Sequence, residues 1–241
     1  MELPVSLPDL ASLLAKLGAT EHDPEGSGIA ELYLEIFSNS PKTRLLLEAS
    51  SVPLCFNFEV ISALLPEENI TSEDMHIFLS SKILKEDNDL TLPYRRLPDL
   101  IRRALRKHLA KENYDFFSKI SFRAYHFFQA DVSYQAEAFY HGLIANPYET
   151  VEHISDAYYA LEQAKQDLSI RKIGMTLEDL LGFPGLSPIA EACVQLYVGK
   201  IKSTKIDLRK RKHLVQNALA LFQNLAQPKG EAESWHALGD I

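Results

Sequence analysis

Two runs of basic residues are the parts of this sequence whose types and spacing could perform chemistry. The first extends from Arg95 to Lys111, and the second from Lys200 to Lys212. Clustered Lys and Arg side chains can contact phosphate, either in a nucleic acid or in a nucleotide that a neighbouring domain holds. The simpler alternative, which we favour, is a solvated helix face with ion pairs to acidic loops. The candidate phosphate contacts in the first run are Arg95, Arg96, Arg102, Arg103, Arg106 and Lys107.

The motifs of common catalytic and cofactor sites are missing from the sequence. There is no G-x-x-x-x-G-K-[ST] loop for phosphates, no G-x-S-x-G nucleophile motif, no H-E-x-x-H and no Cys/His cluster. Cys55 and Cys193 each lie within an apolar pattern, which predicts buried thiols. We therefore expect no catalytic residue, no metal site and no cofactor.

Composition limits the classes of partner. The 241 residues carry a formal net charge of −8, which disfavours strong nonspecific binding to nucleic acid. The longest apolar runs are too short to cross a bilayer, and the N-terminus lacks the pattern of a signal peptide. These features predict a soluble, cytoplasmic chain with no membrane partner.

The elements that must position the first basic run lie between Arg44 and Lys111. Apolar spacing predicts helices at 45–52 and 60–65, and a third helix that begins at Thr71 or Ser72. A polar turn at 86–89 and the alternation in residues 90–94 predict a hairpin. A further helix is expected to share one apolar face, formed by Leu97, Leu100, Ile101, Ala104, Leu105 and Leu109. This order predicts a winged helix-turn-helix.

The third helix of this unit argues against DNA reading. Such helices usually meet base edges with Arg, Lys, Asn or Gln. Here the segment reads SEDMHIFLSSK, which is acidic at its leading end and basic only at Lys82. Its leading end would repel phosphate, so the sequence favours a winged helix that packs against protein.

The rest of the chain has the spacing of helices joined by short turns. An amphipathic helix is expected at 7–17, and helices follow one another from Tyr114 onward. A turn is expected at Gly182–Gly185 and a last break at Pro228–Gly230. These helix pairs suggest an α-solenoid with degenerate repeats. The expected class is mainly α, in three segments: an N-terminal helical segment 1–40, a winged helix 41–112 and a helical, repeat-like domain 113–241.

The last residues match the opening of a tetratricopeptide repeat, W-x2-L-G-x2-Y. Trp235, Leu238 and Gly239 occupy the first three fixed positions, and the tyrosine would follow Ile241. The match predicts that Trp235 and Leu238 face a partner helix and that Gly239 allows its close approach. It also suggests a fragment of a longer protein, or a terminal half-repeat.

The segment from about residue 40 to residue 125 resembles the region that follows the nucleotide-binding core in the STAND class of signal-transduction ATPases. There, a P-loop ATPase is followed by a winged helix, a helical linker and repeats such as tetratricopeptides. The chain lacks the ATPase core, so no catalytic residue is carried over. The resemblance is carried by Leu45, Leu46, Leu47, Ala49, Ser50, Val52, Phe56, Tyr94, Leu97, Asp99, Leu100, Ile101 and Arg102.

Two functions follow from these patterns as expectations. The first is a non-catalytic regulatory and protein-interaction module, in which the winged helix and repeats couple partner sensing to activation, as the resemblance implies. Its partner would be a neighbouring ATPase domain or a sensed protein. The alternative is a winged-helix transcriptional regulator that binds DNA. An enzyme built within the helical bundle is the remote third hypothesis.

Overall fold

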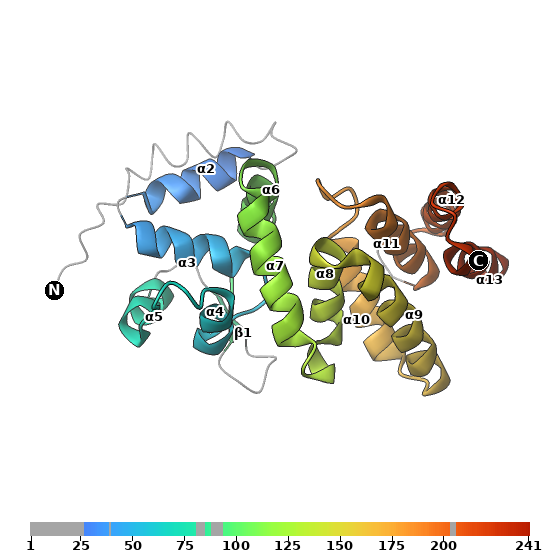
Figure 1. The fold of residues 1–241 in the computed structure, drawn as a ribbon, viewed down its shortest axis with the longest axis horizontal. Coiled ribbons are helices and arrows are strands. Elements are labelled where there is room, and N and C mark those ends of the chain that lie inside the picture. Colours follow the sequence, from blue (N-terminus) through green and yellow to red (C-terminus); the bar gives the residue numbers. More distant parts are fainter. Residues whose placement is uncertain (1–26, 39, 81–84, 88–93, 203–205) are drawn as a thin grey trace. The chain divides into compact units, whose positions relative to one another are not determined.

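The chain is mainly α-helical and divides into two units. The computed structural model describes residues 27–38, 40–80, 85–87, 94–202 and 206–241 (Figure 1). The units are residues 1–120 and 121–241, with the boundary inside α7 (Tyr114–Phe128). We expected boundaries after residues 40 and 112. Helix α2 (Ser27–Ile36) packs on α6 (Asp99–Glu112), so it is part of the first unit. The helix expected at 7–17 lies outside the described residues.

Three short helices of the first unit begin where polar side chains can cap them. They are α3 (Pro41–Ser51), α4 (Phe58–Leu64) and α5 (Ser72–Leu79). The side chains of Ser40, Asn57 and Thr71 accept hydrogen bonds from backbone N–H groups in the first turns of these helices. Because α3 packs on α4, α5 and α6, it forms the centre of the unit (Figure 1).

The start of α5 combines a capping box with an ion pair. Thr71 Oγ1 accepts from the backbone N–H of Asp74, and the Asp74 carboxylate accepts from the backbone N–H of Thr71 at 2.8 Å. Lys42 Nζ of α3 lies 2.7 Å from the same carboxylate. The hydrogen bonds from Lys42 and Thr71 lower the pKa of Asp74 to about 2. These contacts hold α5 against α3.

Two strands follow α5 and pair antiparallel. Strand β1 (Lys85–Asp87) lies beside β2 (Tyr94–Arg96), with Glu86 opposite Arg95. Glu86 and Asp87 were expected in the turn and instead belong to β1, while residues 83–84 and 88–93 lie outside the described part. Phe56, between α3 and α4, also pairs with β2: its N–H donates to Arg95 O at 2.9 Å, and its carbonyl accepts from Arg95 N–H at 2.8 Å. The segment before α4 is therefore tied to the second strand.

The buried face of α6 differs from the expected one. Ile101, Leu105 and Leu109 are buried as predicted, but Leu100 is 64% exposed, so its placement on that face was wrong. The reason is that Arg102 and Arg106 are also buried. Their positions turn the buried face of the helix away from Leu100.

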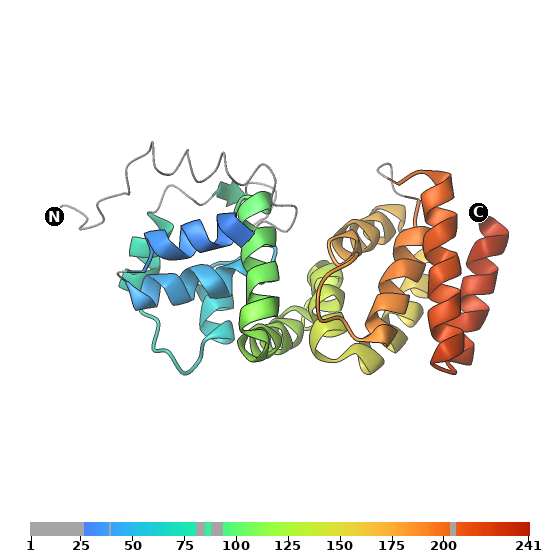
Figure 2. The same ribbon diagram turned by 90° about the horizontal axis from the view of Figure 1, so that it is seen from above.

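The second unit consists of helices that pack on their neighbours in the chain. Its helices α8 and α9 pack together, as do α10 and α11, and α12 and α13. Helix α8 also packs on α10, α9 on α11, and α11 on α12 (Figure 2). After the shared α7 and a single 3-10 turn at Val132–Tyr134, the helices are α8 (Gln135–Ala145), α9 (Pro147–Gln163), α10 (Asp167–Glu178), α11 (Pro188–Lys200), α12 (Leu208–Asn224) and α13 (Pro228–Asp240).

Three turns in the described part of this unit use left-handed backbone, the first of them at Lys165 between α9 and α10, with φ of +54°. Gly182 and Gly185, with φ of +67° and +82°, form the turn that the sequence predicted before α11. The break expected at Pro228–Gly230 was misplaced, because Pro228 is the first residue of α13, where proline is well tolerated. The turn lies just before it and includes Ala226, with φ of +52°.

Both cysteines are buried and neither forms a disulfide, which confirms the prediction of buried thiols. Among the residues that the structure describes, no helix combines the length and the apolar composition that crossing a membrane requires.

Candidate functional site

The six candidate phosphate contacts do not form one basic surface. Arg102 and Arg106 are 2% and 1% exposed, so their selection as surface contacts was wrong. Arg96 and Arg103 are exposed, whereas Arg95 and Lys107 are half-buried. The error has a physical origin: cations on an amphipathic helix were assigned to its solvent face, yet the long Arg side chain can enter a core when its stem packs on apolar groups.

The second basic run, residues 200–212, also contains both buried and exposed cations. Arg211 is buried, and its guanidinium donates from Nε to Gly199 O at 2.9 Å and from Nη2 to Lys200 O at 3.0 Å. It thereby satisfies carbonyls at the C-terminal end of α11, which have no partner within that helix. Lys205 lies outside the described residues. Within the described part of this run, Arg211 therefore joins α12 to α11, whereas Lys202, Arg209, Lys210 and Lys212 are exposed.

The tetratricopeptide-like residues do not pack as the motif predicts against any described helix. Trp235 is 59% exposed, and no atom lies within 4 Å of a Cβ added at Gly239. Leu238 is half-buried. The face of α13 that packs on α12 and α11 carries small residues instead: Gly230, Ser234 and Ala237. These small residues recur at helical spacing, and this signal was present in the sequence.

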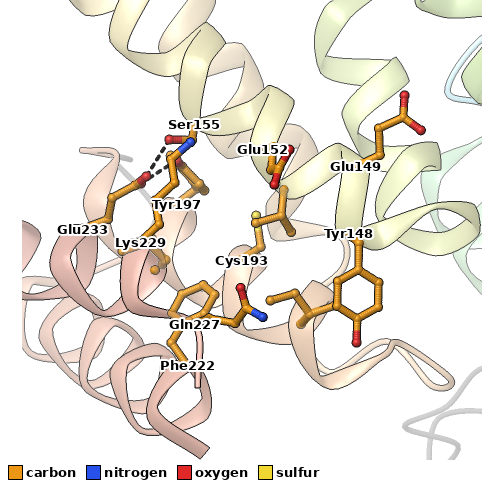
Figure 3. A pocket seen from close by; sticks show the side chains of 14 residues that line it. Tyr148, Glu149, Glu152, Ser155, Cys193, Tyr197, Phe222, Gln227, Lys229 and Glu233 are labelled. Atoms are coloured by element: carbon orange, nitrogen blue, oxygen red, sulfur yellow. Dashed lines mark hydrogen bonds between the residues drawn. The ribbon is translucent and has the colours of Figure 1, made fainter. Parts of the chain in front are cut away.

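A pocket of about 440 Å³ opens in the second unit where α9, α11 and α13 meet (Figure 3). Apolar side chains from α9, α11 and α12, among them Ile189, Leu196 and Phe222, form much of its wall. Its charged lining consists of three glutamates, Glu149, Glu152 and Glu233, and one lysine, Lys229. The pocket is thus an apolar recess with a formal charge of −2.

The Glu233 carboxylate is the most buried charged group of this pocket. Its residue is 7% exposed, and both carboxylate oxygens accept hydrogen bonds from neutral hydroxyl groups (Figure 3). Ser155 of α9 donates to Oε1, and Tyr197 of α11 donates to Oε2 at 2.7 Å. Within the described part of the chain, no Lys, Arg or His nitrogen lies within 4.0 Å of it. Glu233 therefore links α13 to α9 and α11 through hydroxyls and not through an ion pair.

Lys200 lies near this network without joining it. Its Nζ is buried over the rings of Tyr158 and Tyr159, 4.0 and 4.7 Å from their centroids, and 5.9 Å from that of Tyr197. Burial lowers the pKa of Lys200, against the opposing effect of Glu233 and other nearby acids. The ammonium is stabilised by the faces of aromatic rings.

Burial also affects the groups that could act as nucleophiles or acids here. It raises the pKa of the Tyr197 phenol, with Cys193 and Glu233 adding to the effect. It raises the pKa of the Cys193 thiol as well, with a smaller contribution from Glu233. Both groups therefore stay protonated near neutral pH. Neither the Cys193 thiol nor the Tyr197 phenol is therefore activated as a nucleophile in this arrangement.

A buried pair elsewhere in the second unit was missed from the sequence. His141 Nε2 lies 3.1 Å from Glu137 Oε1 on α8, and the imidazole stacks on Phe128. Their spacing of four residues on a predicted helix was the available signal. Glu149 and His153, which are also four residues apart on a helix, have other partners: Glu149 accepts from Asn146, and His153 contacts Tyr125 OH.

The Glu233 network could not have been found from spacing. Its members come from three helices, and Ser155 lies 78 positions from Glu233 in the chain.

Across the described ranges, no group of three or more His, Cys, Asp and Glu residues is arranged to hold a metal ion. Comparison of the chain with protein-family models, with curated proteins and with solved structures found no match.

Proposed function

We propose that this chain is a non-catalytic, regulatory protein-interaction module, made of a winged-helix unit and a tetratricopeptide-like helical array. Its partner would be a protein, either an adjoining ATPase domain or a sensed protein, in the cytoplasm. The single observation that carries the proposal is the character of α5, the third helix of the first unit, because that helix decides whether a winged helix reads DNA or packs on protein.

The order of elements in the first unit supports the winged-helix assignment. Helix α3 is followed by the extended residue Phe56, then by α4, α5, β1 and β2. The pairing of Phe56 with Arg95 adds a third backbone segment to the two-stranded hairpin. This is the arrangement expected of a helix-turn-helix that carries a wing.

The surface of α5 favours a protein partner over DNA. The exposed residues Glu73, His76 and Ile77 include an acid and an apolar side chain but neither Lys nor Arg. At the leading end, Asp74 is an anion paired with Lys42 of α3 at 2.7 Å, and the exposed Glu73 adds a second negative charge. A phosphate backbone would meet negative charge here, whereas a protein surface could cover Ile77.

The second unit supports an interaction role of the helical-repeat kind. Its helices pack as successive neighbours, each pair on the next, which is the packing that gives repeat arrays an extended surface. The further assignment, to the STAND class of signalling ATPases, depends on the sequence resemblance of residues 40–125. In that context the winged helix and the array would couple partner sensing to activation of an ATPase core.

The proposal is tested by nucleotide binding and turnover with the purified chain. Isothermal titration with ATP and ADP should give no binding heat, and a phosphate-release assay should give no turnover above buffer. Measurable turnover that survives repurification would overturn the non-catalytic role.

The alternative function, DNA binding, is favoured by the exposure of Arg96 and Arg103. It predicts a steep fall in affinity with salt, and loss of binding when both are changed to Glu. Arg102 and Arg106 must be left intact in this test, because their burial means that charge reversal would unfold the unit. Absence of binding to a labelled duplex at low salt would leave the protein-interaction role.

A further inference from the structure

We infer that the pocket between α9, α11 and α13 receives a basic side chain, lysine or arginine, presented by a protein partner. The inference deepens the proposed interaction role and rests on it, because it names the chemistry of the group that the helical array would recognise. It is carried by the placement of the Glu233 carboxylate in the wall of an apolar recess.

The buried Glu233 carboxylate has no cation in contact with it in the described part of the chain. Buried carboxylates are usually paired with a cation or held by several hydrogen bonds, since burial of an isolated charge is costly. Glu233 has two hydroxyl donors, one for each oxygen, and no cationic nitrogen within 4.0 Å among the described residues. A carboxylate can accept about four hydrogen bonds, so each oxygen retains the capacity to accept another. An incoming ammonium or guanidinium would supply both charge and donors.

Two lysines, Lys229 and Lys200, lie near the pocket. Lys229 lines the pocket, but its ammonium pairs with Asp156 at 3.4 Å. The Lys200 ammonium is engaged by the tyrosine rings. Neither ammonium lies within 4.0 Å of Glu233 in the described chain, and the lining keeps its formal charge of −2. The charge of the recess is complementary to a cation.

The lining and the volume of the pocket suit a long basic side chain. Ile189, Leu196 and Phe222 of the lining suit the aliphatic stem of a long basic side chain. The carboxylates of Glu233 and Glu152, which Figure 3 labels, suit its charged end. A volume of about 440 Å³ exceeds what a bare inorganic cation needs, and the described carboxylates do not form a metal cluster. An acidic or neutral polar ligand would add no positive charge beside Glu233 to that of the nearby Lys200.

The test uses n-butylguanidinium as a mimic of the arginine side chain and n-butylurea as its neutral counterpart. Titrations of the ¹⁵N-labelled chain, followed by two-dimensional NMR, should give shifts at α9, α11 and α13 with the first compound and none with the second. Equal binding of the two compounds would overturn the inference, and so would the absence of binding by n-butylguanidinium.

Single substitutions test which carboxylate of the pocket binds n-butylguanidinium. Glu233→Gln should weaken n-butylguanidinium binding about tenfold or more, since a desolvated charge-assisted hydrogen bond is lost. Glu231→Gln, the same change on the same helix but outside the pocket lining, should leave affinity unchanged. If Glu233→Gln disturbs the fold, the variant Glu152→Gln tests the inference in its place. It should weaken n-butylguanidinium binding about threefold. Equal effects of Glu233→Gln and Glu231→Gln, or unchanged affinity in both pocket variants, would contradict the inference.

A final comparison distinguishes a protein partner from a free polyamine as the source of the cation. Acetyl-arginine N-methylamide carries the peptide groups that a partner would bring, and it should bind at least as tightly as n-butylguanidinium. Tighter binding of putrescine than of this compound would overturn the claim of a protein partner. These outcomes are independent of nucleotide turnover, so failure of the inference and failure of the proposed function are distinguishable.

Discussion

Replacement of Gly230 by alanine should distinguish the packing of α13 from the sequence motif that this helix carries. In the structure, a Cβ added at Gly230 would lie 2.5 Å from Cγ and 2.6 Å from Cε1 of Phe222 on α12. The Phe222 ring is buried, so it cannot swing into solvent. At Gly239 in the same helix, an added Cβ meets no described atom within 4 Å. The same substitution therefore has opposite expected effects at the two positions.

The magnitudes follow from two opposing contributions. Alanine is favoured over glycine in a helix by up to about 1 kcal/mol. Overpacking of a core contact costs about 1–3 kcal/mol. Gly230→Ala should thus lower the free energy of unfolding by about 1–2 kcal/mol, whereas Gly239→Ala should raise it by up to about 1 kcal/mol.

The assay is urea denaturation of the full chain, followed by the fluorescence of Trp235, the sole tryptophan and a residue of α13. Far-UV circular dichroism reports on the helices of both units in parallel. A destabilisation of this size should lower the urea midpoint by about 0.5–1 M. A double-mutant cycle with Phe222→Leu, which removes the ring, should give a coupling energy of about 1–2 kcal/mol.

Two results would refute this reasoning. One is equal stability of Gly230→Ala and Gly239→Ala, which would mean that α12 and α13 do not approach at Gly230. The other is an unchanged cost of Gly230→Ala when it is combined with Phe222→Leu, since the clash is assigned to the ring of Phe222.

Three other predictions concern single groups. Tyr197→Phe removes the donor to Glu233 Oε2 and should lower stability by about 1–3 kcal/mol in thermal denaturation, whereas the exposed Tyr148→Phe should be neutral. The Asp74 carboxyl should titrate by NMR near pH 2, below its ordinary 3.8; its contribution to stability is present above the ordinary value and lost as pH falls through about 2. Thr71→Val should raise this pKa, and an unchanged titration would argue against the capping box. Finally, both buried cysteine thiols should react with a thiol reagent only at the rate of unfolding, so fast reaction of the native chain would contradict their burial.

The helices of this chain could be predicted because their signals are local. Apolar spacing and capping residues such as Thr71 act within one or two turns, so α5 begins where the sequence predicted. The glycines at 182 and 185 marked a turn for an equally local reason, their left-handed backbone. Local signals also indicated the mainly α class.

The site was not predictable, because it depends on which faces of the helices meet. Arg106 was assigned to solvent by its charge, although packing around α6 buries it. Trp235 was assigned to a helix interface by a motif, although α13 packs through Gly230 and its small neighbours. The sequence did not distinguish Glu233 from a surface acid, because Ser155 and Tyr197, which donate hydrogen bonds to it, belong to two other helices.

The hydrogen bonds of the Arg211 guanidinium limit which residues can be substituted where α11 meets α12. Its two acceptors, Gly199 O and Lys200 O, belong to the main chain, which every amino acid supplies. The side chain at position 200 can therefore change without loss of either acceptor. The donor cannot change so freely, because a lysine at position 211 offers a single nitrogen in place of a rigid fork. One residue, Arg211, thus supplies both of these hydrogen bonds between α12 and α11.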